Sequence, residues 1–326
     1  MDRILECVPN ISEGRNSKII NSIANEINKI ENVKLLHIDS NKDANRTVIT
    51  FAGEPGSVYL GAYNLVKKAA ELIDMRKHKG VHPRFGAVDV CPFIPISGIS
   101  MDETIKIARN FGRQIANDLS IHIYLYENAA AKENRKKLEN CRRGEYEGLE
   151  EKIKNPEWKP DFGPDLFNIK TGATAVGARN YLIAYNINLE TKSVDIAKRI
   201  AGEIRESGTK NKQPGLFKHV KAIGWYIKEY NVVQVSTNIT NPDKISVYEV
   251  FDKVEKLAIH YKTKIIGSEI VGLIPLKYIL NIKENHTLIN NDVLISNAIK
   301  YLKLNHLYPF IPENKILDLL LYKHFN

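Results

Sequence analysis

Isoleucines recur every three or four positions after the first apolar run of the chain and fall on one face of a helix between residues 16 and 30. They are Ile19, Ile20, Ile23, Ile27 and Ile30. This spacing is typical of an amphipathic helix that packs on a core. Apolar runs at 3–11, 33–40 and 46–53 predict strands. A second helix is predicted over 55–73, with proline at its entry, and a further strand over 81–95.

The second half of the chain repeats this order of patterns. Strands are predicted over 181–189, 219–227, 231–240 and 264–275, and helices over 193–208 and 246–262. Each half therefore reads strand, helix, strand, strand, helix, strand. This order predicts an α+β protein with two ferredoxin-like (βαββαβ) subdomains. Because each sheet would carry helices on one face only, we expect the two sheets to face each other.

The boundary between the halves is placed near Gly177, which gives an N-terminal subdomain at 1–177 and a C-terminal one at 178–326. The charged stretch 132–154 is predicted as helix, and the Pro- and Gly-rich stretch 156–165 as an irregular loop. The tail from 290 to 326 is predicted as helical.

Composition narrows the class of protein. The chain has 326 residues, 43% hydrophobic and 26% charged, which is typical of globular proteins. Its three cysteines are an odd number without a C-x-x-C pair, which argues against a disulfide framework or a cysteine zinc site and favours a reducing compartment. No signal pattern and no apolar run of ~18 residues is found. We therefore expect a cytoplasmic protein that does not enter a membrane.

The net charge points to an anionic partner. Lysine and arginine total 47 against 38 acidic residues, a formal charge of +9. Such an excess is typical of proteins that bind nucleic acid or a polyanionic small molecule. The strands lack the aromatic motif that stacks RNA bases, which argues against a nucleic-acid partner, although a nucleic-acid-binding module remains the alternative from a different class.

The stretch "HKGVHPRFG" at 78–86 concentrates titratable groups. His78 and His82 have the spacing of a helical metal pair, but Gly80 and Pro83 disfavour a helix, so we expect no metal. Instead the stretch predicts a loop before a strand. There His82 is a candidate acid–base catalyst, and the alternative is a purely structural histidine. The nearby positive charges, of Lys77, Lys79 and Arg84, would favour its neutral form.

Several segments together resemble the formiminotransferase family, the glutamate formimidoyltransferases. They are "ECVPNISEG", "HIDSNKDANRTVITFAG", "HKGVHPRFGAVDVCPFIP", "KPDFGP", "GATAVGARNYLIAYNINL", "RESG", "VQVSTNIT" and "GSEIVGLIPL", in order along nearly the whole chain. The resemblance implies transfer of a formimidoyl group between N5 of tetrahydrofolate and the amino nitrogen of glutamate, in histidine degradation. It also implies a homodimer and a folate site in the cleft between the subdomains. Some relatives carry a fused cyclodeaminase domain, and we expect no deamination from this chain.

The resemblance implies roles for particular residues. His82 is the catalytic histidine, used as a proton shuttle, and Asp39 is our candidate for holding its tautomer, with turn capping as the alternative. Glutamate carboxylates call for a planar clamp from Arg46, Arg84 or Arg179. The folate loop corresponds to Gly163, Pro164, Asp165, Leu166, Phe167, Asn168, Ile169, Lys170, Thr171 and Gly172.

The charge excess then finds an explanation, because the polyglutamyl tails of cellular folates are polyanions. The alternative activity within the same class is formyl transfer, by a glutamate formyltransferase or an enzyme that handles 5-formyltetrahydrofolate. An amide and an amidine differ only by O in place of NH.

Overall fold

The computed structural model describes residues 3–80, 82–209, 213–228, 230–281 and 291–325 of the chain. The chain forms two compact units, Met1–Arg179 and Asn180–His324, and each is described by itself. Their division falls two residues after Gly177, where the sequence analysis placed its boundary. Both units combine helices with a sheet, so the predicted α+β class is confirmed. That the two sheets face each other stays a prediction.

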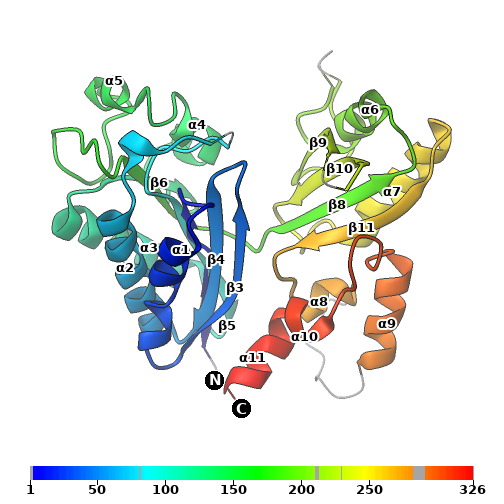
Figure 1. Ribbon diagram of the computed structural model, residues 1–326, viewed down its shortest axis with the longest axis horizontal. Coiled ribbons are helices and arrows are strands. Elements are labelled where there is room, and N and C mark those ends of the chain that lie inside the picture. The colour runs from blue at the N-terminus through cyan, green and yellow to red at the C-terminus, as the bar shows by residue number, and fades with distance from the viewer. Residues whose placement is uncertain (1–2, 81, 210–212, 229, 282–290, 326) are drawn as a thin grey trace. The chain divides into compact units, whose positions relative to one another are not determined.

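The first unit is built on a seven-stranded mixed sheet (Figure 1). Its strands are β1 (Ile4–Cys7), β2 (Asn10–Ile11), β3 (Val33–Asn41), β4 (Arg46–Gly53), β5 (Val88–Ser97), β6 (His122–Glu127) and β7 (Ala173–Ala178). The short strands β1 and β2 both lie between β4 and β5, and β3 pairs with β4. On the other side β7 runs parallel to β5, and β6 runs parallel to β7.

Helices cover one face of this sheet in Figure 1. They are α1 (Ser17–Ala24), α2 (Pro55–Leu72) and α3 (Met101–Leu119), while α4 (Leu138–Arg142), α5 (Leu149–Lys154) and the 3₁₀ turns Ile27–Lys29, Met75–Lys77 and Glu133–Arg135 lie in connections. Local sequence explains where the long helices begin. Pro55 occupies the first turn of α2, and Ser100 and Glu103 form a capping box before α3.

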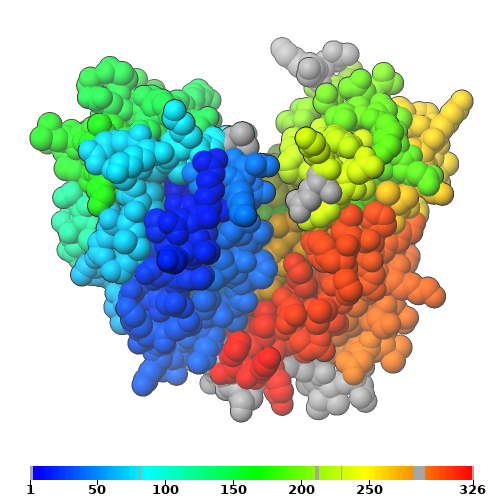
Figure 2. Space-filling view, in the orientation of Figure 1, coloured from blue at the N-terminus to red at the C-terminus, as the bar shows by residue number. Residues whose placement is uncertain are grey.

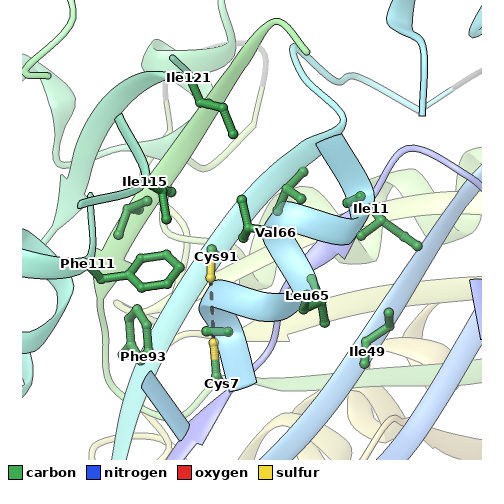
Figure 3. Close-up of a cluster of buried hydrophobic side chains, with 14 of the residues drawn as sticks. Cys7, Ile11, Ile49, Leu65, Val66, Cys91, Phe93, Phe111, Ile115 and Ile121 are labelled. Carbon is green, nitrogen blue, oxygen red and sulfur yellow. Dashed lines mark hydrogen bonds between the residues drawn. The ribbon is translucent and has the colours of Figure 1, made fainter. Parts of the chain in front are cut away.

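The core of the first unit lies between these helices and the sheet (Figure 3). Phe111 of α3 packs edge-to-face on Phe93 of β5, with ring centroids 5.1 Å apart. Beside them the Sγ atoms of Cys7 and Cys91 lie 3.6 Å apart, as free thiols. Each large apolar side chain buried in this way stabilises the fold by ~1.5–3 kcal/mol. The core therefore fixes β1 and β5 against α3.

Parts of the first unit differ from the sequence interpretation. The stretch 99–131, which the repeat left unassigned, folds as α3 and β6, and β7 was also missed. The predicted helix over 132–154 is interrupted, and only α4 and α5 form. Gly144 has φ +87°, a left-handed conformation that ends α4 and that side chains rarely adopt. In the strand predicted over 81–95, Val81 lies outside the described residues and the continuous strand begins at Val88.

The second unit contains a four-stranded antiparallel sheet of order β11-β8-β10-β9. Its elements are β8 (Ile183–Leu189), α6 (Val194–Ile204), β9 (Val220–Ile227), β10 (Val232–Ile239), α7 (Val247–His260) and β11 (Ile265–Val271), so the predicted order of strands and helices is found here. The tail adds α8 (Leu276–Ile279), α9 (Asp292–Tyr301), α10 (Pro312–Lys315) and α11 (Leu317–Phe325).

The C-terminal helices form part of the surface of the second unit. Figure 2 shows α9 to α11 as a continuous orange-to-red patch on this unit. Ile295 and Leu302 from this segment are buried in the core of the second unit, together with Ile316. The predicted helical tail is therefore found between 291 and 325, while residues 290 and 326 lie outside the described part. Within the described residues, no helix combines the length and the apolar character that crossing a bilayer requires.

Candidate active site

The loop from His78 to Gly86 is held in an irregular conformation by close backbone contacts. A Cβ atom on Gly80 would lie 2.2 Å from the carbonyl oxygen of Ala44, so only glycine fits there. The amide of Asn45 donates to the Lys79 carbonyl at 3.0 Å, and the hydroxyl of Ser12 donates to the Gly86 carbonyl at 2.7 Å. The loop is therefore fixed against the start of β4 and the end of β2.

Both ring nitrogens of His82 have partners in the first unit. Nδ1 lies 2.7 Å from the carbonyl oxygen of Pro83, and Nε2 lies 2.8 Å from Nη1 of Arg46. A carbonyl can only accept and a guanidinium can only donate a hydrogen bond. The neutral tautomer with its proton on Nδ1 satisfies both contacts. The lone pair of Nε2 then points at Arg46.

The pKa of His82 is lowered to about 4, first by burial and then by the positive charges of Arg46 and Arg142. The ring is therefore neutral at pH 7, the form that a general base needs. The sequence analysis expected a neutral ring but named other charges, those of Lys77, Lys79 and Arg84. In the structure, the positive charges that act on His82 are those of Arg46 and Arg142. Arg46 is the first residue of β4, and Arg142 is the last residue of α4.

Arg46 is the first residue of β4, and its guanidinium uses only part of its hydrogen-bonding capacity. Its Nε atom is buried and has no hydrogen-bond partner in the described part of the chain. No carboxylate within the described parts of the chain forms an ion pair with its guanidinium. Burial lowers the pKa of Arg46 to about 10, while the charges of Asp89 and Asp39 act in the opposite direction. Arg46 is thus a partly buried cation whose hydrogen-bonding capacity is partly unused.

The role predicted for Asp39 is filled by another group. Asp39 lies on β3 opposite Val48 of β4. Because both ring nitrogens of His82 are already bonded, the Pro83 carbonyl, and not Asp39, sets the tautomer of the ring. The negative charge of Asp39 acts on Arg46 instead. Asp39 therefore belongs to the charge environment of the site in this conformation.

Asp89 and Arg142 form a buried ion pair that the sequence analysis missed. Asp89 is 1% exposed, accepts the backbone N–H of Phe85 at 3.1 Å and pairs with the guanidinium of Arg142. The pair joins β5 to α4. A carboxylate inside the apolar run "AVDVCPF" was the available signal, since a buried charge needs a partner.

Arg84 is engaged by carboxylates of the chain itself. Nη1 and Nη2 donate to the two carboxylate oxygens of Glu147 at 2.8 and 2.7 Å, and Nη1 also reaches Glu145 at 3.1 Å. Its Nε donates to Nδ1 of His78 at 3.2 Å, and Nε2 of His78 lies 2.8 Å from the Asn45 carbonyl. His78 is therefore a buried structural residue of the opposite tautomer to His82. Sequence spacing gave no signal for Glu145 or Glu147.

Arg179 lies elsewhere in the first unit. Its backbone N–H donates to the carbonyl of Phe93 at 3.1 Å. Phe93 is four residues along β5 from Asp89, roughly 13 Å at the usual rise of a strand. The charge of Arg179 acts on the buried carboxyl of Glu6, where it opposes a rise in pKa caused by burial. The structure therefore brings the guanidinium of Arg46 to His82 and places the backbone of Arg179 beside Phe93, further along β5.

The predicted folate loop adjoins the His82 loop. Gly172 forms an antiparallel bridge with Gly86, and the N–H of Ala87 donates to the Thr171 carbonyl at 2.8 Å. The loop bends at Gly163 and Gly172, with φ +128° and +67°. The C-terminal ends of the two loops are therefore bonded to each other, directly before β5 and β7.

The folate loop exposes apolar side chains at its tip. Leu166 is 84% and Ile169 is 52% exposed, whereas the ring of Phe167 packs 5.9 Å from that of Tyr146. His122 is fully buried at the start of β6, and its ring lies 6.2 Å from that of Phe167. Asp165 is exposed and forms an ion pair with Lys159, with 3.0 Å between Oδ1 and Nζ. Exposed apolar groups above an aromatic layer are suited to a flat ligand.

These features combine, in an α+β protein, a neutral histidine with a partly buried positive charge, the surroundings that acid–base chemistry requires. The model of the formiminotransferase domain, N-terminal subdomain, matches residues 4–179, and that of the formiminotransferase domain matches residues 184–322. A formimidoyltransferase-cyclodeaminase of Dictyostelium discoideum is 45% identical over 98% of this chain and 60% of that protein.

Shorter relatives match over most of their own length. A glutamate formimidoyltransferase of Streptococcus pyogenes serotype M1 is 41% identical over 87% of this chain and 93% of that protein. A glutamate formimidoyltransferase of Thermoplasma acidophilum is 40% identical over 88% of this chain and 93% of that protein. The chain belongs to the formiminotransferase domain family, as the sequence resemblance predicted. It spans 60% of the length of the cyclodeaminase fusions that it matches.

Proposed function

We propose that the protein transfers a formimidoyl group between 5-formimidoyltetrahydrofolate and L-glutamate. The other pair of compounds in this exchange is tetrahydrofolate and N-formimidoyl-L-glutamate, and the step belongs to histidine degradation. The neutral ring of His82, with Nε2 as acceptor, carries the proposal. Membership of the family supports it, since relatives at 40–41% identity bear the name glutamate formimidoyltransferase.

His82 moves the proton that the transfer requires. In either direction the amine nitrogen of one substrate attacks the formimidoyl carbon, and a new C–N bond forms. The C–N bond to the other nitrogen then breaks. The attacking nitrogen loses one proton and the leaving nitrogen gains one, so a single imidazole can carry both at Nε2. Nδ1–H stays bonded to the Pro83 carbonyl and keeps the ring in place.

Tetrahydrofolate is the co-substrate, and we place it on the loop from Gly163 to Gly172. Leu166 and Ile169 are exposed there without an evident structural role. Apolar side chains of this kind provide contact area for a flat heterocycle. The bends at the two glycines allow the backbone to approach a ligand closely.

Glutamate is bound, in this proposal, by one of Arg46, Arg84 and Arg179. Arg46 is the first choice because its Nε–H is unpaired and it contacts His82. The fork of Arg84 already holds Glu147. The backbone of Arg179 follows β7 and is bonded to Phe93 of β5.

The charge of +9 favours capture of polyglutamylated folate. Each γ-glutamyl residue adds one negative charge. Triglutamyl folate is therefore expected to bind more tightly than monoglutamyl folate at low salt, and the difference should shrink above ~0.5 M salt because ions screen exposed charges. Equal affinities at low salt, measured by calorimetry, would contradict this explanation.

The finer features of fold and assembly also belong to the proposal. The order β11-β8-β10-β9 of the second unit is that of a ferredoxin-like sheet, and the strands β3, β4, β1/β2 and β5 of the first unit follow the same order. We further propose a homodimer that acts in the cytoplasm. Light scattering on purified protein tests the homodimer, and a monomer at working concentration would remove it.

The activity is tested with the wild type, His82→Ala and His260→Ala. His260 is an exposed histidine of α7 in the other unit and serves as the matched control. Release of glutamate from N-formimidoyl-L-glutamate is followed by mass spectrometry in the presence of tetrahydrofolate. His82→Ala should lose ~10²–10⁴-fold in turnover, while stabilisation by folinic acid in thermal unfolding is kept.

Near-native turnover of His82→Ala would remove His82 from the mechanism. N-formyl-L-glutamate is run beside the formimidoyl compound in the same assay. A faster reaction with the formyl donor would favour the alternative activity, formyl transfer.

A further inference from the structure

The atom that a general base uses is covered in this structure. Nε2 of His82 accepts a hydrogen bond from Arg46 at 2.8 Å, and its other nitrogen is committed to Pro83. A lone pair that already accepts from a guanidinium cannot take a proton from a substrate. Arg46 must therefore move before His82 can act.

Among the residues that the structure describes, Arg46 has no counter-ion at hydrogen-bonding distance. Two other arginines of this unit have carboxylate partners, because Arg84 pairs with Glu147 and Arg142 pairs with Asp89. Arg46 has a buried, unpaired Nε–H and no ion pair among the described residues. Burying a cation without a partner costs free energy. Such a group is prepared for an incoming anion, and carboxylates match a guanidinium fork best.

We propose that the α-carboxylate of glutamate binds Arg46 and thereby draws its guanidinium away from Nε2 of His82, so that binding of the amino acid uncovers the base. The inference rests on the proposed function and gives Arg46 a second role besides binding. Substrate recognition and activation of His82 become one event.

Geometry favours the α-carboxylate over the γ-carboxylate. The α-carboxylate and the reacting nitrogen are attached to the same carbon. Before glutamate binds, Nη1 of Arg46 and Nε2 of His82 are 2.8 Å apart, so after the guanidinium turns to the carboxylate its side chain still lies next to the ring. A carboxylate held by Arg46 therefore leaves the nitrogen beside His82, whereas the γ-carboxylate is separated from it by two further carbons. Amines without an α-carboxylate should consequently fail in turnover as well as in binding.

The charges that act on Arg46 come from three elements, and none of them supplies this carboxylate. Asp39 on β3 and Asp89 on β5 favour the positive charge on Arg46, while Arg142 on α4 opposes it. Asp89 is held by Arg142 and by the Phe85 amide. Neither carboxylate forms an ion pair with Arg46 among the described residues, so a substrate carboxylate would not have to displace one.

The test follows the ring of His82 by NMR in histidine-labelled protein, with His82→Gln to assign its signals. The ring is titrated alone, with saturating L-glutamate, and with 4-aminobutyrate, which keeps the amine and one carboxylate but lacks the α-carboxylate. Glutamate neutralises Arg46 and removes its hydrogen bond. The pKa of His82 should therefore rise by at least one pH unit with glutamate and stay unchanged with 4-aminobutyrate.

Arg46→Gln and Arg3→Gln complete the experiment. Arg46→Gln should raise the pKa of His82 in the free protein and abolish the response to glutamate. The KM for N-formimidoyl-L-glutamate should rise at least tenfold, with folinic acid affinity within twofold. Arg3, an exposed arginine of the same unit paired with Glu103, is the matched control and should leave all three readouts unchanged.

Several results would overturn the inference. The first is binding of glutamate, measured by calorimetry, that leaves the His82 titration unchanged. The second is a titration shift with 4-aminobutyrate equal to that with glutamate, and the third is normal binding of glutamate to Arg46→Gln. None of these depends on turnover. A wild type that shows the titration shift but transfers no formimidoyl group would instead contradict the proposed function and leave the glutamate site in place.

Discussion

Replacing Glu6 by glutamine is expected to stabilise the first unit at neutral and alkaline pH. Glu6 lies in the middle of the sheet, where β1 pairs with Ala52 of β4 and Ile94 of β5, and it is 2% exposed. Burial raises the pKa of its carboxyl from 4.5 to about 7, although the positive charge of Arg179 opposes the rise. The folded protein therefore holds this proton more tightly than the unfolded chain does.

The sign and size of the effect follow from this difference in proton affinity. Stability contributed by the protonated carboxyl is fully present below pH 4.5 and is lost as the pH rises towards 7. Above pH 7 the folded state carries a buried charge at a constant cost. At about 1.4 kcal/mol per pH unit, the whole window corresponds to about 3 kcal/mol. Glutamine has the same shape and cannot ionise, so it avoids this cost.

The assay is urea unfolding at pH 5, 6, 7 and 8. The chain has two tryptophans, and Trp158 lies in the first unit while Trp225 lies in the second. In a Trp225→Phe background, Trp158 fluorescence therefore follows the first unit alone. The advantage of Glu6→Gln over the parent should grow with pH to about 3 kcal/mol at pH 8. Glu31→Gln, at an exposed position of the same unit, should stay within ~0.5 kcal/mol of the parent throughout.

The reasoning would be refuted by a constant difference between Glu6→Gln and its parent over this pH range. That result would mean that Glu6 is ionised in the folded protein well below pH 5. A loss of stability that grows with pH would refute it as well, since it would show that the charge is favourable where it lies.

Two further predictions concern the frame of the site. Gly172→Ala should destabilise the first unit by at least ~1 kcal/mol and weaken folinic acid binding in thermal unfolding, because Gly172 has φ +67° and a Cβ would lie 2.3 Å from the Phe85 carbonyl oxygen. Unchanged melting would contradict this. Asp89→Asn should destabilise the unit by up to ~3–5 kcal/mol in urea, because it leaves the partly buried Arg142 without its counter-ion. It should also lower the pKa of His82 further in the NMR titration, because the Asp89 charge raises it; an increase would contradict the assigned surroundings.

The sequence was sufficient to locate the His82 loop but not the contacts that define its chemistry. Gly80 and Pro83 correctly predicted a loop, since both oppose a helix there. The contact of His82 with Arg46 joins residues 36 positions apart. It depends on where β4 begins relative to the loop, and hydrophobic periodicity contains no such information.

Other partners could be found only in part. Asp89 was recognisable as a carboxylate in an apolar run, but its partner was not. Several lysines and arginines of the stretch 132–143 have the same pattern of charge, and only Arg142 is brought to β5 by the break after α4. Likewise α3 and β6, which lie between β5 and β7, were missed. The sequence of the second half offers no counterpart to them, so the repeat did not predict them. A repeat predicts only the helices and strands that both halves contain, and it gives no information on elements that one half has in addition.

The low pKa of His82 makes it a weak base when substrate is absent, and the inferred role of Arg46 resolves this difficulty. A base is most effective when its pKa lies near the working pH. A pKa of about 4 leaves His82 neutral but a poor proton acceptor, and Arg46 is one of the charges responsible. A substrate carboxylate that neutralises Arg46 removes that contribution, at about 1.4 kcal/mol of proton affinity for each pH unit regained. The base is thus strengthened only when the amino acid is bound. This arrangement limits proton transfer to occasions on which the reacting nitrogen is next to the ring.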